Sequence, residues 1–240
     1  MDVLTREQLL RRLGGRRALA SALASGAWQR VLRGTYAPGD APLDLTVRGR
    51  AALLLVPARA LVADRCLLWL LGVDGLDPGP PGLEVVVPRG APVPRRRGVR
   101  ARTTDLPRAD RDVLRTSELD RLPVLRPVRA VADLMRALPL AEAVVVGDAV
   151  QHAGLATRDE VEVELDGHRG LRGVREARRA LLLTDARAES PPESRVRVLL
   201  VLGGLAPVPQ HEVRDTRGRF VARVDLALPG ARVADEFDGR

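Results

Sequence analysis

The sequence predicts an α+β protein in three parts, and three observations support this class. Two short helical patterns and a hairpin pattern occupy residues 1–40. Helical and strand patterns are then mixed through residues 41–186, and a helix followed by several strands fills residues 187–240. Apolar residues make up 45% of the 240 residues, which is enough for each part to bury a core.

The first part begins with a helix whose start is marked by Thr5-x-x-Gln8, a capping-box pattern. Leu4 and Leu9 fit the hydrophobic staple around this cap, and Gly14-Gly15 ends the helix. A second helix is expected from Arg16 to Ser25, with Gly26 as its stop. Two short helices joined by a tight glycine turn are typical of a helix-turn-helix.

Residues 28–36 follow as a predicted hairpin, which would form the wing of a winged helix-turn-helix. The helix, the glycine turn and the closing Gly34-x-Tyr36 resemble the winged-helix domain of AbiEi-type antitoxins. The resemblance implies DNA as a partner, and a toxin as a further one. The residues expected to contact the DNA groove or backbone are Arg16, Arg17, Gln29, Arg30 and Arg33. The alternative is that these residues form a solvated basic face.

The middle part mixes helices and strands. Residues 43–71 read as two helical segments broken near Pro57, and residues 74–82 as a loop. Leu83 to Val87 reads as a strand, and residues 94–98 as a basic loop. A strand at 122–126 leads into a helix that begins at Pro127, which resembles the same antitoxin-like proteins. Residues 140–183 are expected to be helical, with a loop at 167–170.

The third part opens with Ser190-Pro191-Pro192-Glu193, followed by a helix that Gly203-Gly204 ends. A strand is predicted at 210–213, a turn at 215–218 and a long alternating strand at 219–228. The link Pro229-Gly230 leads into a last strand, Val233 to Asp238, which places Glu236 and Asp238 on one face.

The register of this last hairpin determines where its acids lie. If a two-residue loop at Gly230-Ala231 closes the hairpin, residue 228 lies opposite 233, and Asp225 lies opposite Glu236. Opposite side chains are about 5 Å apart. Two like charges at that distance destabilise a sheet, and a divalent cation is the simplest compensation.

These acids resemble those of the PD-(D/E)XK nucleases, in particular small bacterial domains related to very-short-patch repair endonucleases. The resemblance implies a restriction-endonuclease-like α/β domain, of which this chain holds the N-terminal part and is therefore incomplete. It assigns Mg²⁺ (or Mn²⁺) to Glu193, Asp225 and Glu236, with the metal activating water for phosphodiester hydrolysis. Gln210 and Asp238 complete the catalytic set, and Asp238 occupies the position of the superfamily's lysine.

Other interpretations of the same residues are structural. Ser190-x-x-Glu193 is also a capping box, in which Glu193 serves the helix start. Asp225 alone fits a solvated strand position, and Asp238-Gly239 fits an ordinary turn.

Composition favours a nucleic-acid partner. The 39 basic residues, all arginine, exceed the 31 acidic ones and give a net charge of +8. The use of arginine alone also fits the codon bias of a GC-rich genome. The single cysteine, Cys66, excludes an intrachain disulfide. No apolar run is long enough for a membrane span, and no signal sequence is present, so we expect a cytoplasmic protein.

Two functions follow. The first is a DNA-binding protein with a metal-dependent endonuclease-like domain. The second is an antitoxin-like transcriptional regulator that binds DNA and has a non-catalytic C-terminal domain. The sequence does not predict the DNA target or the oligomeric state.

Overall fold

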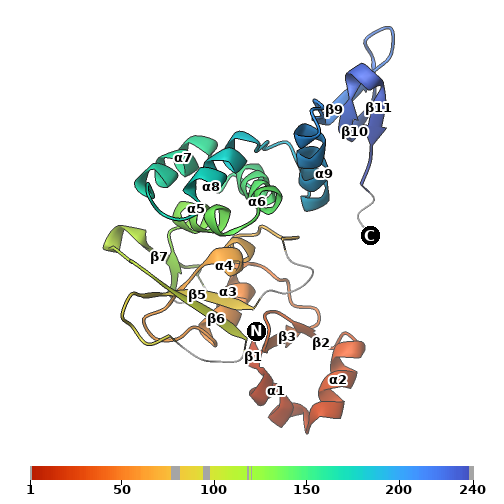
Figure 1. Cartoon of the computed structure of the whole chain (residues 1–240). Coiled ribbons are helices and arrows are strands. Elements are labelled where there is room, and N and C mark those ends of the chain that lie inside the picture. Colours follow the sequence, from red (N-terminus) through yellow and green to blue (C-terminus); the bar gives the residue numbers. More distant parts are fainter. Residues whose placement is uncertain (1, 77–81, 94–97, 118, 120, 238–240) are drawn as a thin grey trace. The chain divides into compact units, whose positions relative to one another are not determined.

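The computed structural model describes residues 2–76, 82–93, 98–117, 119 and 121–237 (Figure 1). The chain divides into two compact units, Met1–Ala130 and Val131–Arg240. Each unit contains both helices and strands, which confirms the α+β class. The boundary between the units falls inside the middle part that the sequence analysis defines.

The first unit begins with the two predicted helices and the predicted hairpin. Its elements are β1 (Leu4–Thr5), α1 (Arg6–Leu13), α2 (Arg16–Ala24), β2 (Trp28–Arg30) and β3 (Thr35–Pro38). The capping box is confirmed, because the Thr5 N–H donates to Gln8 Oε1 at 2.8 Å and the Gln8 N–H donates to Thr5 Oγ1 at 3.3 Å. Gly14 ends α1 in the left-handed conformation, with φ of 83°.

Strand β1 was not expected. It pairs with β3, so that β3 lies between β1 and β2 in a small antiparallel sheet. Leu9, Leu19 and Tyr36 form a core between this sheet and the two helices. Residues 4–38 therefore have a small core of their own, while Val31, Leu32 and Ala37 belong to the larger core of the first unit.

The rest of the first unit surrounds a five-stranded sheet. Its elements are α3 (Leu45–Leu53), β4 (Leu61–Val62), α4 (Asp64–Leu70), β5 (Leu83–Pro88), β6 (Val99–Thr104), the short 3-10 helix η1 (Arg108–Asp110), β7 (Arg111–Leu114) and β8 (Leu122–Leu125). The strand order is β6-β5-β4-β8-β7, with parallel pairs β5–β6 and β4–β8. Helices α3 and α4 contact the sheet through β8 and β5 and share its core (Figure 1).

The two helices and the strand expected between residues 43 and 88 are confirmed, as is the strand before Pro127. The short strand β4 was missed because two residues are too few for an alternating pattern. Residues 77–81 of the expected loop, and residues 94–97 of the basic loop, lie outside the described residues.

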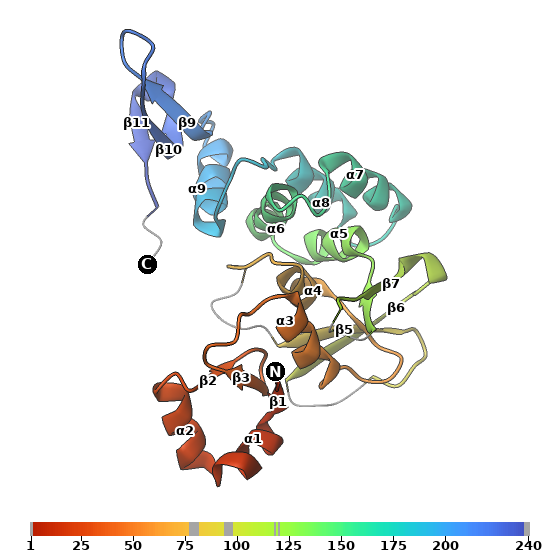
Figure 2. The same ribbon diagram turned by 180° about the vertical axis from the view of Figure 1, so that it is seen from behind.

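Helices dominate the start of the second unit. They are α5 (Pro127–Ala137), which crosses the unit boundary, α6 (Leu140–His152), α7 (Arg158–Gly167), α8 (Val174–Leu182) and α9 (Pro191–Leu202). Helix α6 contacts both α8 and α9, and α7 contacts α8 (Figure 2). These helices confirm the prediction for residues 140–183, including the loop between α7 and α8.

A three-stranded antiparallel sheet follows α9. It consists of β9 (Val208–Arg214), β10 (Phe220–Leu228) and β11 (Val233–Asp235), with the 3-10 turn η2 (Pro229–Ala231) between the last two. Strand β10 is central, and α9 contacts it. Strand β11 ends three residues before Asp238, which lies outside the described residues.

Candidate functional site

Helix α9 places Glu193 at the start of the C-terminal segment. Pro191 and Pro192 occupy the first turn, and the Glu193 N–H donates to Ser190 Oγ at 3.4 Å. Glu193 itself is buried, with 4% of its surface exposed. Farther along the helix, Arg197 is held against α6 by an ion pair of 2.6 Å to Asp148, and both side chains are buried. The position of Glu193 is therefore fixed by a cap and by a buried ion pair.

The carboxylate of Glu193 has two roles. Its Oε1 accepts from the Ser190 hydroxyl at 2.6 Å, and its Oε2 accepts from the Glu189 N–H at 3.1 Å. Oε2 also accepts from the side-chain amide of Gln210, at 3.0 Å. The Ser190 half of the predicted capping box is confirmed, but Glu193 accepts from the N–H of Glu189 and not from that of the N-cap Ser190. The same carboxylate also faces the sheet.

Gln210 joins Glu193 to Asp225. Its Nε2 lies 3.0 Å from Glu193 Oε2 and 3.4 Å from Asp225 Oδ1. The backbone of Gln210 has a φ of 51°, a left-handed conformation that is rare for a non-glycine residue. Its Oε1 is buried and has no hydrogen-bond partner in the structure. Three of the predicted residues therefore converge on one point beside α9.

The register of the last hairpin is confirmed. Leu228 pairs with Val233, and Leu226 pairs with Asp235, so Asp225 and Glu236 follow as the next opposite positions. The Phe237 N–H donates to Asp225 Oδ2 at 2.8 Å, which keeps this segment beside β10. Sequence reasoning missed this contact, although the register that it predicted places residue 237 close to Asp225.

The expected two-residue loop was wrong. Residues 229–232 connect the paired positions 228 and 233, with η2 at Pro229–Ala231 and Arg232 left-handed at φ of 54°. The Arg232 N–H donates to the Pro229 carbonyl at 3.2 Å, but Pro229 has no N–H to donate in return, so only half of the pair that a two-residue loop requires is formed. The longer connection leaves the register unchanged.

Glu236 does not complete a three-acid cluster. Its side chain is exposed. Among the described residues, no three or more His, Cys, Asp or Glu side chains form a group that could hold a metal ion. The structure thus brings together Glu193, Gln210 and Asp225 but not Glu236, and Asp238 is outside the described residues.

The charge balance around Glu193 and Asp225 is unusual for carboxylates that are buried or half-buried. Within the described parts of the chain, no arginine or histidine forms an ion pair with Glu193 or Asp225. Two arginines close to them in the sequence pair with other acids: Arg197 pairs with Asp148, and Arg223 pairs with Glu189 at 3.0 Å. The amide nitrogen of Gln210 therefore lies between two carboxylates that have no compensating cation among the described residues.

The residues predicted to contact DNA lie in the N-terminal segment. Arg16, Arg17, Arg30 and Arg33 are exposed. Gln29 differs, because its Nε2 donates to three backbone carbonyls, those of Pro38, Gly39 and Ala41, at 2.7–3.1 Å. Its amide group holds the end of β3 and is not directed to a ligand.

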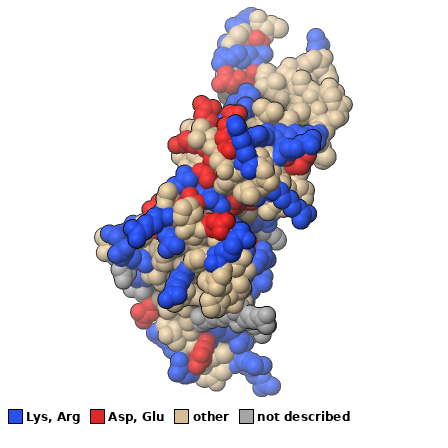
Figure 3. Space-filling model, turned by 60° about the vertical axis from the view of Figure 1, so that its left-hand side comes forward, with Lys and Arg blue, Asp and Glu red and all other residues tan. Residues whose placement is uncertain are grey.

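Arginine side chains are spread over the surface. On the face shown in Figure 3, acidic side chains lie among the arginines. In the N-terminal segment, Arg12 stacks on the ring of Trp28 at 5.5 Å. In the described parts of the chain, no helix is long and apolar enough to cross a membrane.

Comparisons with known proteins give little functional information. No family model matches the sequence. Two uncharacterized proteins of Mycobacterium tuberculosis, MT2308 of strain CDC 1551 and Rv2248 of strain H37Rv, are each 33% identical over 114 residues, which is 47% of this chain. The match spans 41% of each relative. The crystal structure of the RV2827C protein of M. tuberculosis covers 83% of this chain and 76% of its own, with 21% identity and a TM-score of 0.37, too low to establish a shared fold.

Proposed function

We propose that this chain is a DNA-binding protein whose C-terminal segment is related to the metal-dependent PD-(D/E)XK endonucleases. The observation that carries this proposal is the hydrogen bonding of Gln210 to both Glu193 and Asp225. These acids come from a helix start and from the middle of a strand. Their meeting matches the role that the sequence resemblance implies for them.

The donor set fits a hard divalent cation such as Mg²⁺ or Mn²⁺. Glu193 and Asp225 supply carboxylate oxygens, and Gln210 Oε1 is a buried oxygen that has no hydrogen-bond partner among the described residues. Glu236, opposite Asp225 in the hairpin register, is the further ligand that we propose. A bound divalent cation supplies an activated water and offsets charge on the phosphate. The protein's own contribution is to hold the two acids in position through Ser190, Gln210 and the Phe237 N–H.

We also propose that residues 2–38 act as a winged helix-turn-helix that brings the chain to DNA. The exposed Arg16 and Arg17 lie at the start of α2, where a recognition helix contacts the groove. Arg30 and Arg33, in the hairpin region, are placed for the phosphate backbone. Arginine suits this task because its guanidinium forms paired hydrogen bonds with phosphate oxygens.

The test of hydrolysis is the cleavage of supercoiled plasmid with Mg²⁺ or Mn²⁺, before and after chelation. We expect metal-dependent nicking that Asp225→Asn and Glu236→Ala abolish. Glu212→Ala is the matched control, because Glu212 is an exposed acid of β9 in the same sheet. Cleavage that persists in Asp225→Asn would show that another site, or a contaminant, is responsible.

A second function is favoured by the incomplete acid cluster. Glu193 and Asp225 already accept hydrogen bonds from the protein, and no three-acid group forms among the described residues. These observations favour an antitoxin-like regulator that binds DNA, and a toxin as its partner, with a C-terminal segment that does not cleave. Binding to its own promoter should then survive Glu236→Ala and be lost in Arg16→Ala combined with Arg17→Ala.

A further inference from the structure

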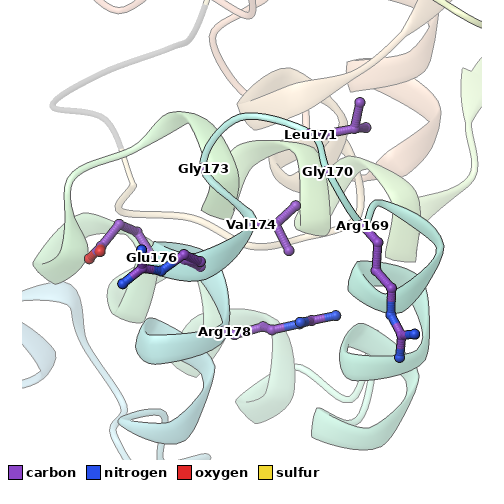
Figure 4. Close-up of a pocket in the computed structure, with 8 residues that line it drawn as sticks. Arg169, Gly170, Leu171, Gly173, Val174, Glu176 and Arg178 are labelled. Atoms are coloured by element: carbon purple, nitrogen blue, oxygen red, sulfur yellow. The ribbon is translucent and has the colours of Figure 1, made fainter.

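The second unit contains a hollow, formed by the loop after α7 and the first turns of α8, that the proposed hydrolytic site does not use. Its volume is about 600 Å³, and the loop that joins the two helices forms one side of it (Figure 4). Gly170 and Gly173 in this loop have φ of 82° and 83°, a conformation that suits glycine. A Cβ on Gly173 would lie 2.0 Å from the Arg136 carbonyl oxygen, so this position requires glycine for packing as well.

The hollow is strongly basic. Residues 166–179 contain five arginines and two acids, a net charge of +3, whereas the whole chain of 240 residues carries +8. Three of these arginines line the hollow, namely Arg169, Arg175 and Arg178. Figure 4 shows the side chain of Arg178 extending toward the guanidinium end of Arg169.

The acids in this segment only partly neutralise the arginines. Asp166 holds Arg178 at 2.5 Å and lies 3.6 Å from Arg169, so one carboxylate serves two guanidinium groups. Glu176 lies 3.8 Å from Arg179. Arg175 is exposed and, within the described parts of the chain, forms no ion pair. Positive charge therefore remains directed to solvent around the hollow.

An oxyanion of modest size is the ligand that this arrangement fits. A guanidinium fork binds two phosphate oxygens at once, and the ends of Arg169 and Arg175 are exposed enough to turn toward a ligand. Helix α8 begins at Gly173 without a side-chain cap, so its first N–H groups add a favourable dipole. The hollow is open and its lining has few apolar side chains, which favours a phosphate on a large partner over a buried small molecule.

We propose that the hollow formed by the loop after α7 and the first turns of α8 binds backbone phosphates of DNA and is a second DNA-contacting surface of the chain. This inference rests on the DNA-binding part of the proposed function and does not depend on hydrolysis. It assigns Arg169 and Arg175 as phosphate-contacting residues, with Arg178 held in place by Asp166.

The test is the equilibrium binding of a fluorescent duplex by the full chain, in EDTA and over a series of salt concentrations. Arg169→Ala combined with Arg175→Ala should weaken binding about tenfold at low salt and reduce the salt slope by about 2, since two phosphate contacts are lost. Arg108→Ala combined with Arg115→Ala is the matched control, because both are exposed arginines of the first unit. Circular dichroism verifies that each variant is folded.

The outcomes separate this inference from the proposed function. If the wild-type chain binds duplex and the Arg169/Arg175 variant binds it with the same affinity, the inference is wrong and the proposed function is unaffected. A wild-type chain that does not bind duplex overturns the inference together with DNA binding. A third measurement titrates the chain with inorganic phosphate. If phosphate shifts the amide NMR signals of Gly170 and Gly173 while the variant binds DNA normally, the hollow binds free phosphate. The inference is then wrong.

Discussion

Each unit contains a pair of neighbouring carboxylates, one buried and one half-buried, and the two pairs are compensated in different ways. In the first unit, Asp64 makes a two-pronged contact with Arg102 at 2.7 and 3.0 Å, and Glu84 pairs with Arg100 at 2.6 Å. In the second unit, Glu193 and Asp225 are joined only by the amide of Gln210. The first pair already has its cations, so its role is structural. The second has no such cation among the described residues, and we propose that it accepts one from solution.

The pKa of Glu84 fits this contrast. Burial raises the pKa of the Glu84 carboxyl, the charge of Asp64 raises it further, and Arg100 and two backbone N–H groups act in the opposite direction. Asp64 also has a φ of 54° at the start of α4, so its backbone is held in a conformation that is rare for aspartate. These features show that two neighbouring carboxylates destabilise each other's charged form, even when each is paired with an arginine.

The largest effect that we predict comes from removing a cation from a buried acid in the second unit. Arg197→Ala leaves Asp148 buried without its partner, and the free energy of unfolding should fall by about 3–5 kcal/mol. Urea unfolding followed by circular dichroism measures this loss. Trp28 and Trp69 both lie in the first unit, so an unchanged tryptophan fluorescence transition is the internal control. A loss below about 1 kcal/mol would show that the pair does not hold α9.

Removing the amide bridge should have an intermediate effect. Gln210→Ala takes away the donor that Glu193 and Asp225 share, and we expect a loss of about 1–3 kcal/mol, as for other buried hydrogen-bond partners. Hydrogen exchange of the β9 and β10 amides measures it. Gln151→Ala is the matched control, since Gln151 also donates through its side-chain amide, at 3.0 Å to the Gly147 carbonyl, but faces no carboxylate. Equal losses in the two variants would show that the bridge has no special role.

The sequence predicted this molecule best where a structure depends on near neighbours. The Thr5 cap, the helix that begins at Pro127 and the register of the last hairpin are all set within a few residues, and all three are confirmed. The meeting of Glu193 with Asp225 was expected from the resemblance, because periodicity does not relate a helix start to a distant strand.

The sequence did not predict features that depend on pairing across the sheet. Asp64 meets Arg102 only because β4, β5 and β6 are neighbours, and neither β4 nor β6 was expected. The commitment of Gln29 to backbone carbonyls depends in the same way on the pairing of β2 with β3. Local patterns carry no information on such contacts.

A divalent cation should distinguish the two acid pairs directly. At an Mn²⁺ concentration about ten times the dissociation constant, a single site raises the free energy of unfolding by about 1.4 kcal/mol. We expect this gain in the second unit, measured by circular dichroism, and not in the first, measured by tryptophan fluorescence. Asp225→Asn should abolish the gain and Glu212→Ala should keep it. A gain that Asp225→Asn retains would place the cation elsewhere.

The smallest effect concerns the pH dependence of the first unit. Because the pKa of Glu84 is raised on folding, the folded carboxyl keeps its proton at pH values where the unfolded one has lost it. The free energy of unfolding therefore falls as the pH rises from the ordinary glutamate pKa through the raised one. Glu84→Gln has no such proton to lose, so its stability relative to the wild type should increase between about pH 5 and about pH 7. Tryptophan fluorescence in urea at both pH values measures this, with the exposed Glu162→Gln as the control for the loss of one carboxylate. If the stability difference between Glu84→Gln and the wild type is the same at both pH values, the arginines fully compensate the first pair of carboxylates. The contrast with the second pair would then be sharper.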